Sequence, residues 1–301
     1  MSIFLIVGVA LILDAVLGEP DWLWKRLPHP AVLMGQGVAW GDARLNNRTQ
    51  IRGIFLVGLL VLSSAIIGLF ISLAGGIVES IVIAILLAQR SLVQHVARVG
   101  ADLRLSLASA RKSVGMIVSR DTSHATHQDV ARAAIESGAE NLSDGVIAPV
   151  FWALIGGVPG ILVYKVVNTA DSMIGYRTPK HEQFGWAAAR LDDVLNWIPA
   201  RLTAALFWIV GGLHGQWDDI QQDARRHKSP NAGWPEAALS RALGIALAGP
   251  RTYHGTVQDL PWVNHTGNTQ IGSAEIDSAI DQLWLAWGLV VVVCFGAAFV
   301  T

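Results

Sequence analysis

Long apolar runs alternate with polar blocks along the whole chain. Residues 51–74 carry a single charge, near one edge, and residues 283–301 carry none. A helix needs ~20 apolar residues to cross a bilayer, so these runs predict membrane-spanning helices. The apolar segments lie at about 3–17, 51–74, 76–89, 145–167, 199–213, 237–249 and 283–301. The pattern predicts an all-α, polytopic helical membrane protein whose polar loops are also helical.

The segment at 145–167 is interrupted in its middle by Gly-Gly-Val-Pro-Gly at 156–160. Each half has room for ~15 Å of helix, which is half of a hydrocarbon core. One interpretation is a broken, re-entrant helix, which requires its turn to be buried in protein. The other is a kink in a spanning helix. The re-entrant form would bring residues 136–144 and 168–177 to one face of the membrane.

The polar blocks also contain helix signals. Apolar residues at helical spacing predict a helix from Arg90 to Met116. A second helix is predicted over 126–141, with Thr126 as its cap and Asp129 as the capping-box partner. Gly138 near its end indicates that the helix loosens there.

Composition supports the membrane class and excludes other classes. The chain is 52% hydrophobic and 15% charged, against roughly 25% charged residues in soluble domains. The balance of 22 basic and 23 acidic residues argues against nucleic-acid binding. A single cysteine, Cys294, excludes an intramolecular disulfide and a multi-cysteine metal site. We expect residues 1–301 to form one membrane-embedded domain, with Lys- and Arg-rich blocks in the cytoplasm.

The densest group of oxygen ligands precedes the broken segment. Glu136 and Glu140 are one helical turn apart and would repel each other unless something compensates their charges. Arg132, one turn earlier, is one compensating group. A divalent cation is the other, since Asn141 and Asp144 add further hard oxygen ligands. The predicted metal ligands are therefore Glu136, Glu140, Asn141 and Asp144.

Two further acidic stretches follow the broken segment. Asn168 and Asp171 stand at its end, where Asp171 is either an oxygen ligand or the cap of the next helix. Asp192 and Asp193 are adjacent, so at most one of them is expected to face a site.

Basic residues supply candidate phosphate contacts. The stretch at 223–238 runs from a basic cluster through a turn at Ser229–Asn231 into a new helix. Such a run can hold a phosphate at the helix N-terminus, or it can contact lipid headgroups. No P-loop, Rossmann, nucleophile-elbow or HExxH motif is present.

Six stretches, in this order, resemble a known family: DAVLGEPDWLWKRLPHPAVLMG, SRDT, ESGAENLSDGVIAPVFW, VNTADSMIGYR, FGWAAARLDDVLNWIPAR and DARRHKSPNAGWPEAA. The family is that of the adenosylcobinamide-phosphate synthases, membrane proteins of cobalamin biosynthesis. The resemblance implies an ATP-dependent amide ligation. A carboxylate of adenosylcobyric acid would be joined to (R)-1-aminopropan-2-ol or its O-phosphate, through an acyl phosphate, with ATP and Mg²⁺ as cofactors.

The resemblance also implies roles for the candidate residues. Glu136, Glu140, Asp144 and Asp171 would be catalytic, and together with Asn141 and one of Asp192 and Asp193 they would hold Mg–ATP. The predicted contacts to phosphate or to corrin carboxylates are Arg111, Arg120, Arg177 and Arg201, with Lys165 and the turn at Ser229 and Asn231 orienting the phosphates. Asn168, Asp192 and Asp193 are further predicted substrate- or ATP-binding residues.

The implied setting is the bacterial inner membrane, with the active site facing the cytoplasm. The implied partners are the corrinoid substrate, aminopropanol phosphate, the lipid bilayer and later membrane enzymes of the cobalamin pathway, with no nucleic acid. A non-catalytic scaffold or corrinoid carrier is the alternative. A CDP-alcohol phosphotransferase is disfavoured, because its motif needs an arginine shortly after Asp144-Gly145, where Ile147-Ala148-Pro149 stands.

Overall fold

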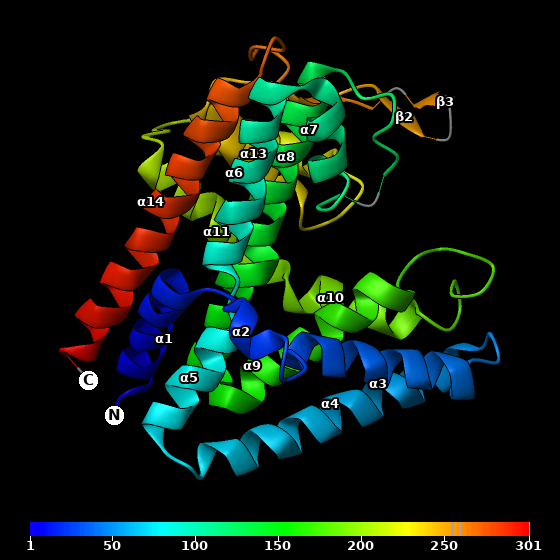
Figure 1. Cartoon of the computed structure of the whole chain (residues 1–301), viewed down its shortest axis with the longest axis vertical. Helices are drawn as coiled ribbons and strands as arrows, with labels where there is room; N and C mark the ends of the chain where they lie inside the picture. The colour runs from blue at the N-terminus through cyan, green and yellow to red at the C-terminus, as the bar shows by residue number, and fades with distance from the viewer. Residues whose placement is uncertain (119, 254–255, 259, 301) are drawn as a thin grey trace. The chain divides into compact units, whose positions relative to one another are not determined.

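The computed structural model of the protein describes residues 1–118, 120–253, 256–258 and 260–300. Helices dominate it (Figure 1). The chain divides into two compact units: unit 1 is Met1–Arg90, Val146–Trp197 and Val291–Thr301, and unit 2 is Ser91–Gly145 and Ile198–Val290. This division describes packing, so a single catalytic domain stays a prediction.

Unit 1 is built around the helix that follows the acidic cluster. Its helices are α1 (Ile3–Leu17), α2 (Asp21–Trp24), α3 (Pro30–Leu45), α4 (Gln50–Ser72), α5 (Gly76–Leu86), α9 (Ala148–Ile174) and α10 (Trp186–Leu195). Both α4 and α3 pack on α9, and Leu56, Ile174 and Phe184 lie in their shared buried core. Gly53 allows α4 to approach this core, because a Cβ there would stand 1.9 Å from the Phe184 carbonyl oxygen.

The helix α9 is broken at the predicted place. Gly157 has φ +59° and ψ −147°, outside the helical region. A Cβ added to Gly160 would lie 2.2 Å from the carbonyl oxygen of Trp152, although residues eight positions apart in a straight helix are separated by ~12 Å. The segment therefore folds back on itself. This confirms the broken helix and favours the re-entrant form over a simple kink.

The turn of this hairpin is buried on one side only, where it packs on α4, while Ile155 and Gly156 at its start are exposed; a re-entrant segment requires a turn that is covered by protein. A Cβ added to Gly68 of α4 would stand 2.5 Å from the Cα of Pro159. Val158 is fully buried. The indole nitrogen of Trp152 donates to the Leu195 carbonyl at 3.1 Å, which ties the first arm to α10.

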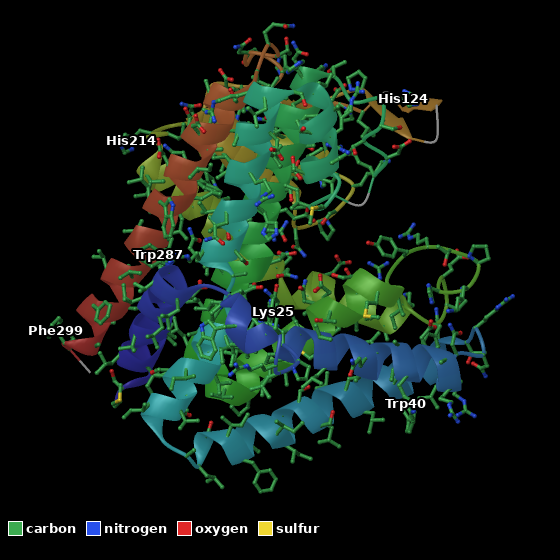
Figure 2. All side chains as sticks on the ribbon, viewed as in Figure 1. Lys25, Trp40, His124, His214, Trp287 and Phe299 are labelled. Atoms are coloured by element: carbon green, nitrogen blue, oxygen red, sulfur yellow. The ribbon has the colours of Figure 1, made fainter. Side chains whose placement is uncertain are left out.

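The long apolar helices confirm a multi-pass membrane protein by length and composition. Four helical stretches are long and apolar enough to span a bilayer among the described residues: Gln50–Ser72, Gly76–Leu105, His127–Ile174 and Ser273–Ala298. Shorter apolar helices are Ile3–Leu17 and Trp197–Val210. Large apolar side chains such as Trp40 and Phe299 are exposed (Figure 2), as expected of surfaces that contact lipid.

Unit 2 contains most of the polar helices. They are α6 (Gln89–Leu105), α7 (Leu107–Val114), α8 (His127–Leu142), α11 (Trp197–Val210), α12 (Trp217–Arg225), α13 (Gly233–Ala242) and most of α14 (Ser273–Ala298). The single helix predicted from Arg90 to Met116 is wrong, because the backbone becomes extended at Ser106, which caps α7.

The predicted cap of α8 is confirmed, since Thr126 and Asp129 form a reciprocal capping box. The loosening predicted near Gly138 is wrong in position. Gly138 stays within the α-helix, and the widened turn is the π-helix η1 (Ser143–Ile147), which contains Asp144.

Two short antiparallel ribbons interrupt the helical pattern. One pairs β1 (Leu247–Ala248) with β4 (Trp262–Val263), and the other pairs β2 (Arg251–Tyr253) with β3 (Thr256–Gln258). The apolar segment predicted at 237–249 is therefore not one helix, since α13 ends at Ala242. The last helix begins at Ser273, ten residues before the predicted segment, whose final residue, Thr301, lies outside the described residues.

Candidate functional site

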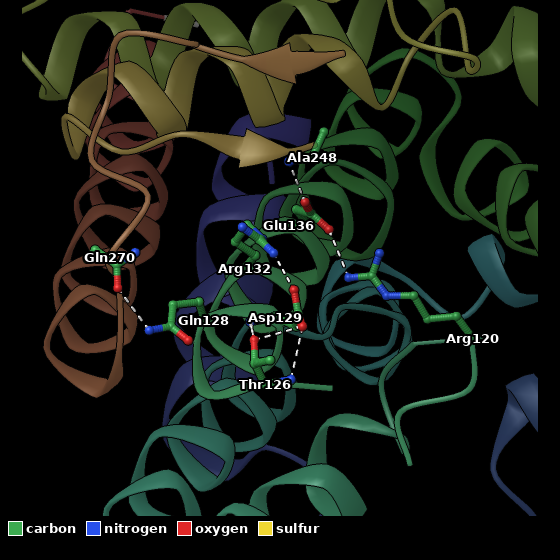
Figure 3. Close-up of polar contacts among 8 residues, drawn as sticks. All are labelled: Arg120, Thr126, Gln128, Asp129, Arg132, Glu136, Ala248 and Gln270. Atoms are coloured by element: carbon green, nitrogen blue, oxygen red, sulfur yellow. Dashed lines mark hydrogen bonds and ion pairs between the residues drawn. The ribbon is translucent and has the colours of Figure 1, made fainter. Parts of the chain in front are cut away.

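Glu136 is buried in the middle of α8 and is held from two sides (Figure 3). Its Oε2 lies 3.1 Å from Nη2 of Arg120, and its Oε1 accepts a 2.7 Å hydrogen bond from the backbone N–H of Ala248. The two side chains are only 16% and 7% exposed for Arg120 and Glu136. Both carboxylate oxygens are thus used within the protein. These contacts give Glu136 a structural role. Its role as a metal ligand stays a prediction.

The strand that meets Glu136 has an unusual backbone. Ala248 has φ +58°, the left-handed region that non-glycine residues rarely adopt. Gly249 follows with φ +71°, and a Cβ there would stand 2.6 Å from the Trp262 ring. The buried hydrogen bond to Glu136 helps to hold Ala248 in this conformation.

Arg132 does not compensate the glutamates as the sequence allowed. It pairs with Asp129, the capping-box partner of Thr126 in the same helix (Figure 3). The Arg132 guanidinium also lies over the Trp262 ring, 5.0 Å from its centre. Figure 3 shows Arg120, from the loop before α8, on the other side of Glu136. The charge partner of Glu136 therefore comes from a loop that the helix pattern did not connect to it.

The last turn of α8 and the π-helix contain the other three predicted ligands. Glu140 and Asn141 are exposed, and Asp144 is half-buried in η1. The amide nitrogen of Asn141 donates to the Ser137 carbonyl at 2.8 Å, and the Ser137 hydroxyl donates to the Ile117 carbonyl at 2.9 Å. π-bulges inside helices occur frequently at functional sites.

Whether Glu136, Glu140, Asn141 and Asp144 bind a metal stays a prediction. No group of three or more His, Cys, Asp and Glu side chains is arranged to hold a metal among the residues that the structure describes. Mg²⁺ in phosphate chemistry usually uses one or two carboxylates and takes its other ligands from water and substrate phosphates. Glu140, Asn141 and Asp144 supply that number of hard oxygen ligands at an accessible helix end.

The loop between α7 and α8 is tied down by Arg111. Its Nε donates to the Ala125 carbonyl at 2.8 Å, while Thr122 donates to the carbonyl of Arg111 at 2.8 Å. Arg120, Asp129 and Arg132 line a small cavity of about 70 Å³ beside this loop. Acidic and basic groups are mixed around it, so it is not a simple anion pocket.

The predicted turn at Ser229–Asn231 is present before α13. The Ser229 hydroxyl accepts from the N–H groups of Asn231 and Ala232, both at 3.2 Å. Asn231 is buried, and the guanidinium of Arg201 lies 4.6 Å from the centre of the Trp234 ring in the first turn of α13. The structure thus brings Arg201 and this turn to the same end of one helix.

The remaining candidates belong to unit 1. Asn168 donates to Oδ1 of Asp192 at 3.2 Å, and Asn196 donates to Oδ2 at 3.0 Å. The hydroxyl of Tyr164 donates to Oδ1 of Asn196 at 2.9 Å. Burial raises the pKa of Asp192, and hydrogen bonds from the two amides only partly oppose this. Asp192 is therefore the aspartate of the pair that faces α9.

Asp193 points to a different set of groups. Its carboxylate lies 3.7 Å from Arg190. Burial raises the pKa of Asp193, against the opposing charges of Arg190 and Arg177. Arg177 itself is exposed.

Asp171 and Lys165 lie on the second arm of α9. The backbone carbonyl of Asp171 accepts from Gly175 at 2.7 Å, and its carboxylate packs so closely on Gly175 that a Cβ there would be 1.9 Å from Oδ1. Lys165 is half-buried. The two predicted groups, 136–144 and 168–177, fall in different units, so their meeting on one face stays a prediction.

A second buried ion pair in unit 2 was missed from the sequence. Arg241 of α13 contacts Asp223 of α12 at 2.6 Å, and the backbone N–H of Asn264 donates to the same carboxylate at 3.0 Å. Asn264 has φ +53°. No spacing rule joins residues 18 and 41 positions apart, so no sequence signal could have found this contact.

Comparisons with known proteins place the chain in a family. The family model described as "CobD/Cbib protein" matches residues 7–283. A Brucella anthropi protein named "Cobalamin biosynthesis protein CobD" is 41% identical, over 98% of this chain and 97% of its own length. Proteins of the same name from Rhizobium meliloti and Rhodobacter capsulatus are 44% and 40% identical, over 95% and 86% of this chain and 94% and 86% of their own lengths. No solved structure matches the chain significantly.

Proposed function

Because the chain belongs to the CobD/Cbib protein family, we propose that it is a cobalamin-biosynthesis enzyme that performs an ATP-dependent amide ligation. The substrates would be adenosylcobyric acid and (R)-1-aminopropan-2-ol O-phosphate, or the free amino alcohol. The relatives named "Cobalamin biosynthesis protein CobD" align with this chain over nearly their whole length, which supports the pathway. The reaction type rests on the family resemblance and on the chemistry of the site.

Both steps of this ligation have a balanced form. The corrinoid carboxylate attacks the γ-phosphorus of ATP and forms an acyl phosphate with release of ADP. The amine then attacks the acyl carbon, phosphate leaves, and the amine loses one proton as the amide forms. The phosphate leaving group makes the acyl carbon reactive at neutral pH, which a free carboxylate is not.

The observation that carries the proposal is the group at the end of α8. Glu140 and Asn141 are exposed and Asp144 lies in the adjoining π-helix, so three oxygen-bearing side chains are presented at one helix end. These residues would hold Mg²⁺, which when bound neutralises phosphate charge. Glu136, one turn away, would position this turn through Arg120 and Ala248.

The other candidates have more limited roles in this proposal. Arg201 and the turn at Ser229–Asn231 would bind phosphate or corrin carboxylates at the start of α13. Arg111 holds the loop that contains Arg120, so Arg111 would act indirectly, by keeping Arg120 in place. In unit 1, Asp171 and Arg177 remain proposed contacts to the nucleotide or the corrinoid, and Lys165 remains a proposed contact to a phosphate group.

We also propose the cellular setting. The protein would lie in the bacterial inner membrane with the site on the cytoplasmic side, where ATP and the corrinoid are found. Later membrane enzymes of the pathway are proposed partners.

The test is a direct assay. The purified protein receives adenosylcobyric acid, Mg–ATP and either aminopropanol or its phosphate, and the amide is detected by mass spectrometry. Product that requires both ATP and Mg²⁺ is expected, and the better amine identifies the natural substrate. Folded protein that binds the corrinoid but forms no amide with either amine would support the scaffold or carrier alternative.

A further inference from the structure

Unit 1 contains a large cavity that the proposed reaction does not use. Its volume is about 390 Å³, far more than one water molecule needs. Side chains from α3, α4, α5 and α9 line it, among them Leu33, Met34, Ile67, Val82 and Leu162. An apolar space of this size is not stably filled by water, which would find too few hydrogen-bond partners there.

The polar groups on the wall do not change this character. Ser63 and Ser64 are the hydroxyl side chains in the lining. Ser63 donates its hydroxyl to the Leu60 carbonyl of its own helix at 3.0 Å, and Ser64 is buried. The lining therefore suits a hydrocarbon occupant.

The cavity continues into a surface expected to contact lipid. Two of its lining residues, Leu33 and Ile67, are more than half exposed. The helix that carries Ile67, α4, is long and apolar enough to span a bilayer, and its neighbouring residues Leu69 and Phe70 are exposed as well. Acyl chains are the molecules present at such a surface, so they are the natural occupants of a cavity that opens there.

Polar residues stand next to one end of the lining in the sequence. The lining begins at Pro30, directly after His29, and the Trp24 ring stands edge-on to His29 with centroids 4.5 Å apart. The indole nitrogen of Trp24 is buried and has no hydrogen-bond partner within the described part of the chain. This donor can reach an acceptor supplied by a ligand.

Charged groups of both signs, Lys165 and Glu19, act on His29 beside this end. Lys165 stands on α9 between the lining residues Leu162 and Val166. Burial lowers the pKa of His29, and the nearby charge of Lys165 lowers it further, while Glu19 opposes both. Lys25 and Arg26 follow Trp24 directly in the sequence. Basic pockets between membrane helices bind anionic lipid headgroups.

We propose that unit 1 holds one anionic phospholipid, with an acyl chain in the cavity between α3, α4, α5 and α9 and its phosphate near Lys165 and Trp24. The lipid fills the space between α3 and α4 and so stabilises the packing of both helices around α9. Trp24 donates to a phosphate or ester oxygen. The ligand is a component of the membrane and not a substrate of the proposed ligation.

The test uses native mass spectrometry of the whole protein. Protein purified in mild detergent is mixed with equal amounts of phosphatidylglycerol and phosphatidylcholine, and retained lipids are counted per chain. One retained phosphatidylglycerol is expected, at a preference of at least about fivefold. Equal retention of phosphatidylcholine would overturn the headgroup assignment, and no retained lipid would overturn the proposal.

Two glycines provide a matched pair of variants. A Cβ at Gly37, on the cavity wall, would meet only the Leu60 side chain, at 3.6 Å, so Gly37→Leu places its side chain in the cavity. A Cβ at Gly58 of α4 would meet nothing within 4 Å, so Gly58→Leu is the control. Gly37→Leu should reduce lipid retention at least fivefold and Gly58→Leu should not. Equal retention in both variants would contradict the assignment of the cavity.

A measurement on the unmodified chain covers the case in which Gly37→Leu does not fold. A phosphatidylglycerol with a photoreactive acyl chain should label peptides from residues 30–37 and 60–71. Labelling only elsewhere would overturn the proposal. Displacement of the label by adenosylcobyric acid would also overturn it, because the cavity would then belong to the corrinoid.

Discussion

In unit 2 the buried carboxylate of Glu136 meets a charged arginine, whereas in unit 1 the carboxylate of Asp192 meets two neutral amides. Glu136 also accepts from a backbone N–H, so its charge is balanced by one cation and one dipole. Asp192 has hydrogen bonds without a balancing cation among these contacts, and burial raises its pKa.

Glu136 and Asp192 are carboxylates that are hydrogen-bonded within the protein, and they can be distinguished from carboxylates that are exposed to solvent. Glu136 and Asp192 have their oxygens occupied by the protein, so each fixes the position of its helix. Glu140 is one turn from Glu136 and is exposed. Two glutamates that look equivalent in the sequence are thus expected to have different roles, and the predictions below test this.

The largest effect is expected at the exposed end of α8. Glu140→Gln or Asp144→Asn removes a negative charge from the proposed magnesium ligands and should lower kcat/KM by at least about 100-fold. The thermal unfolding temperature should stay within a few degrees of that of the unchanged protein. Near-normal turnover in both variants would contradict the proposed magnesium site.

The next effect is the loss of the buried ion pair. Glu136→Ala leaves Arg120 buried without its carboxylate and Ala248 without its acceptor, so the free energy of unfolding should fall by about 3 kcal/mol. Denaturant titration of the protein in detergent measures this.

A double-mutant cycle with Arg120→Ala provides the control. The double variant should be less destabilised than the sum of the two single variants, because the unpaired arginine is no longer there. Simple additivity would mean that the contact between Arg120 and Glu136 contributes nothing to stability.

A smaller effect is expected where unit 1 depends on close backbone packing. Gly68→Ala places a Cβ 2.5 Å from the Cα of Pro159 at the turn of the α9 hairpin, which should destabilise the protein by about 2 kcal/mol. Gly58→Ala on the same helix meets nothing within 4 Å and should have almost no effect. Thermal unfolding of the two variants side by side checks the hairpin, and equal behaviour would argue against it.

The smallest effect concerns Asp192 and pH. The pKa of Asp192 is higher in the folded protein than its ordinary value of 3.8. Its folded state therefore binds the proton more tightly. The contribution of Asp192 to stability is fully present below pH 3.8 and is lost as the pH rises through the window up to the raised pKa.

Asp192→Asn should remove this pH dependence. The variant loses one hydrogen bond to Asn196 and should be less stable by about 1 kcal/mol at low pH. The gap to the unchanged protein should narrow above pH 3.8, as measured by thermal unfolding across the pH range. A gap that widens with pH would mean that the ionised form of Asp192 is favoured by the fold.

Local rules predicted the elements that depend on local chemistry. Thr126 and Asp129 predicted the start of α8 because a capping box involves only four consecutive residues. The glycines and proline at 156–160 predicted the break in α9, because Gly157 adopts a backbone conformation that favours glycine.

Long-range contacts could not be predicted in this way. Glu136 and Ala248 are 112 positions apart, and their hydrogen bond depends on a two-residue strand in a segment whose apolar pattern indicated a helix. No sequence signal indicated the π-helix that contains Asp144 either. Its turn is widened by one residue, and no glycine or proline stands before Gly145 within it. Residues 136–144 could be identified from the sequence as a cluster of oxygen ligands. The division of this cluster into a buried, structural part and an exposed part could not be predicted.

The most direct test of this division is equilibrium binding of Mg–ATP to three purified proteins: the unchanged chain, Glu140→Gln and Glu136→Gln. Binding should weaken at least about tenfold in Glu140→Gln. In Glu136→Gln it should change less than about threefold, provided that the protein is measured at a temperature at which it stays folded. Weakened binding in Glu136→Gln with normal binding in Glu140→Gln would contradict the account, because the buried glutamate would then be the magnesium ligand.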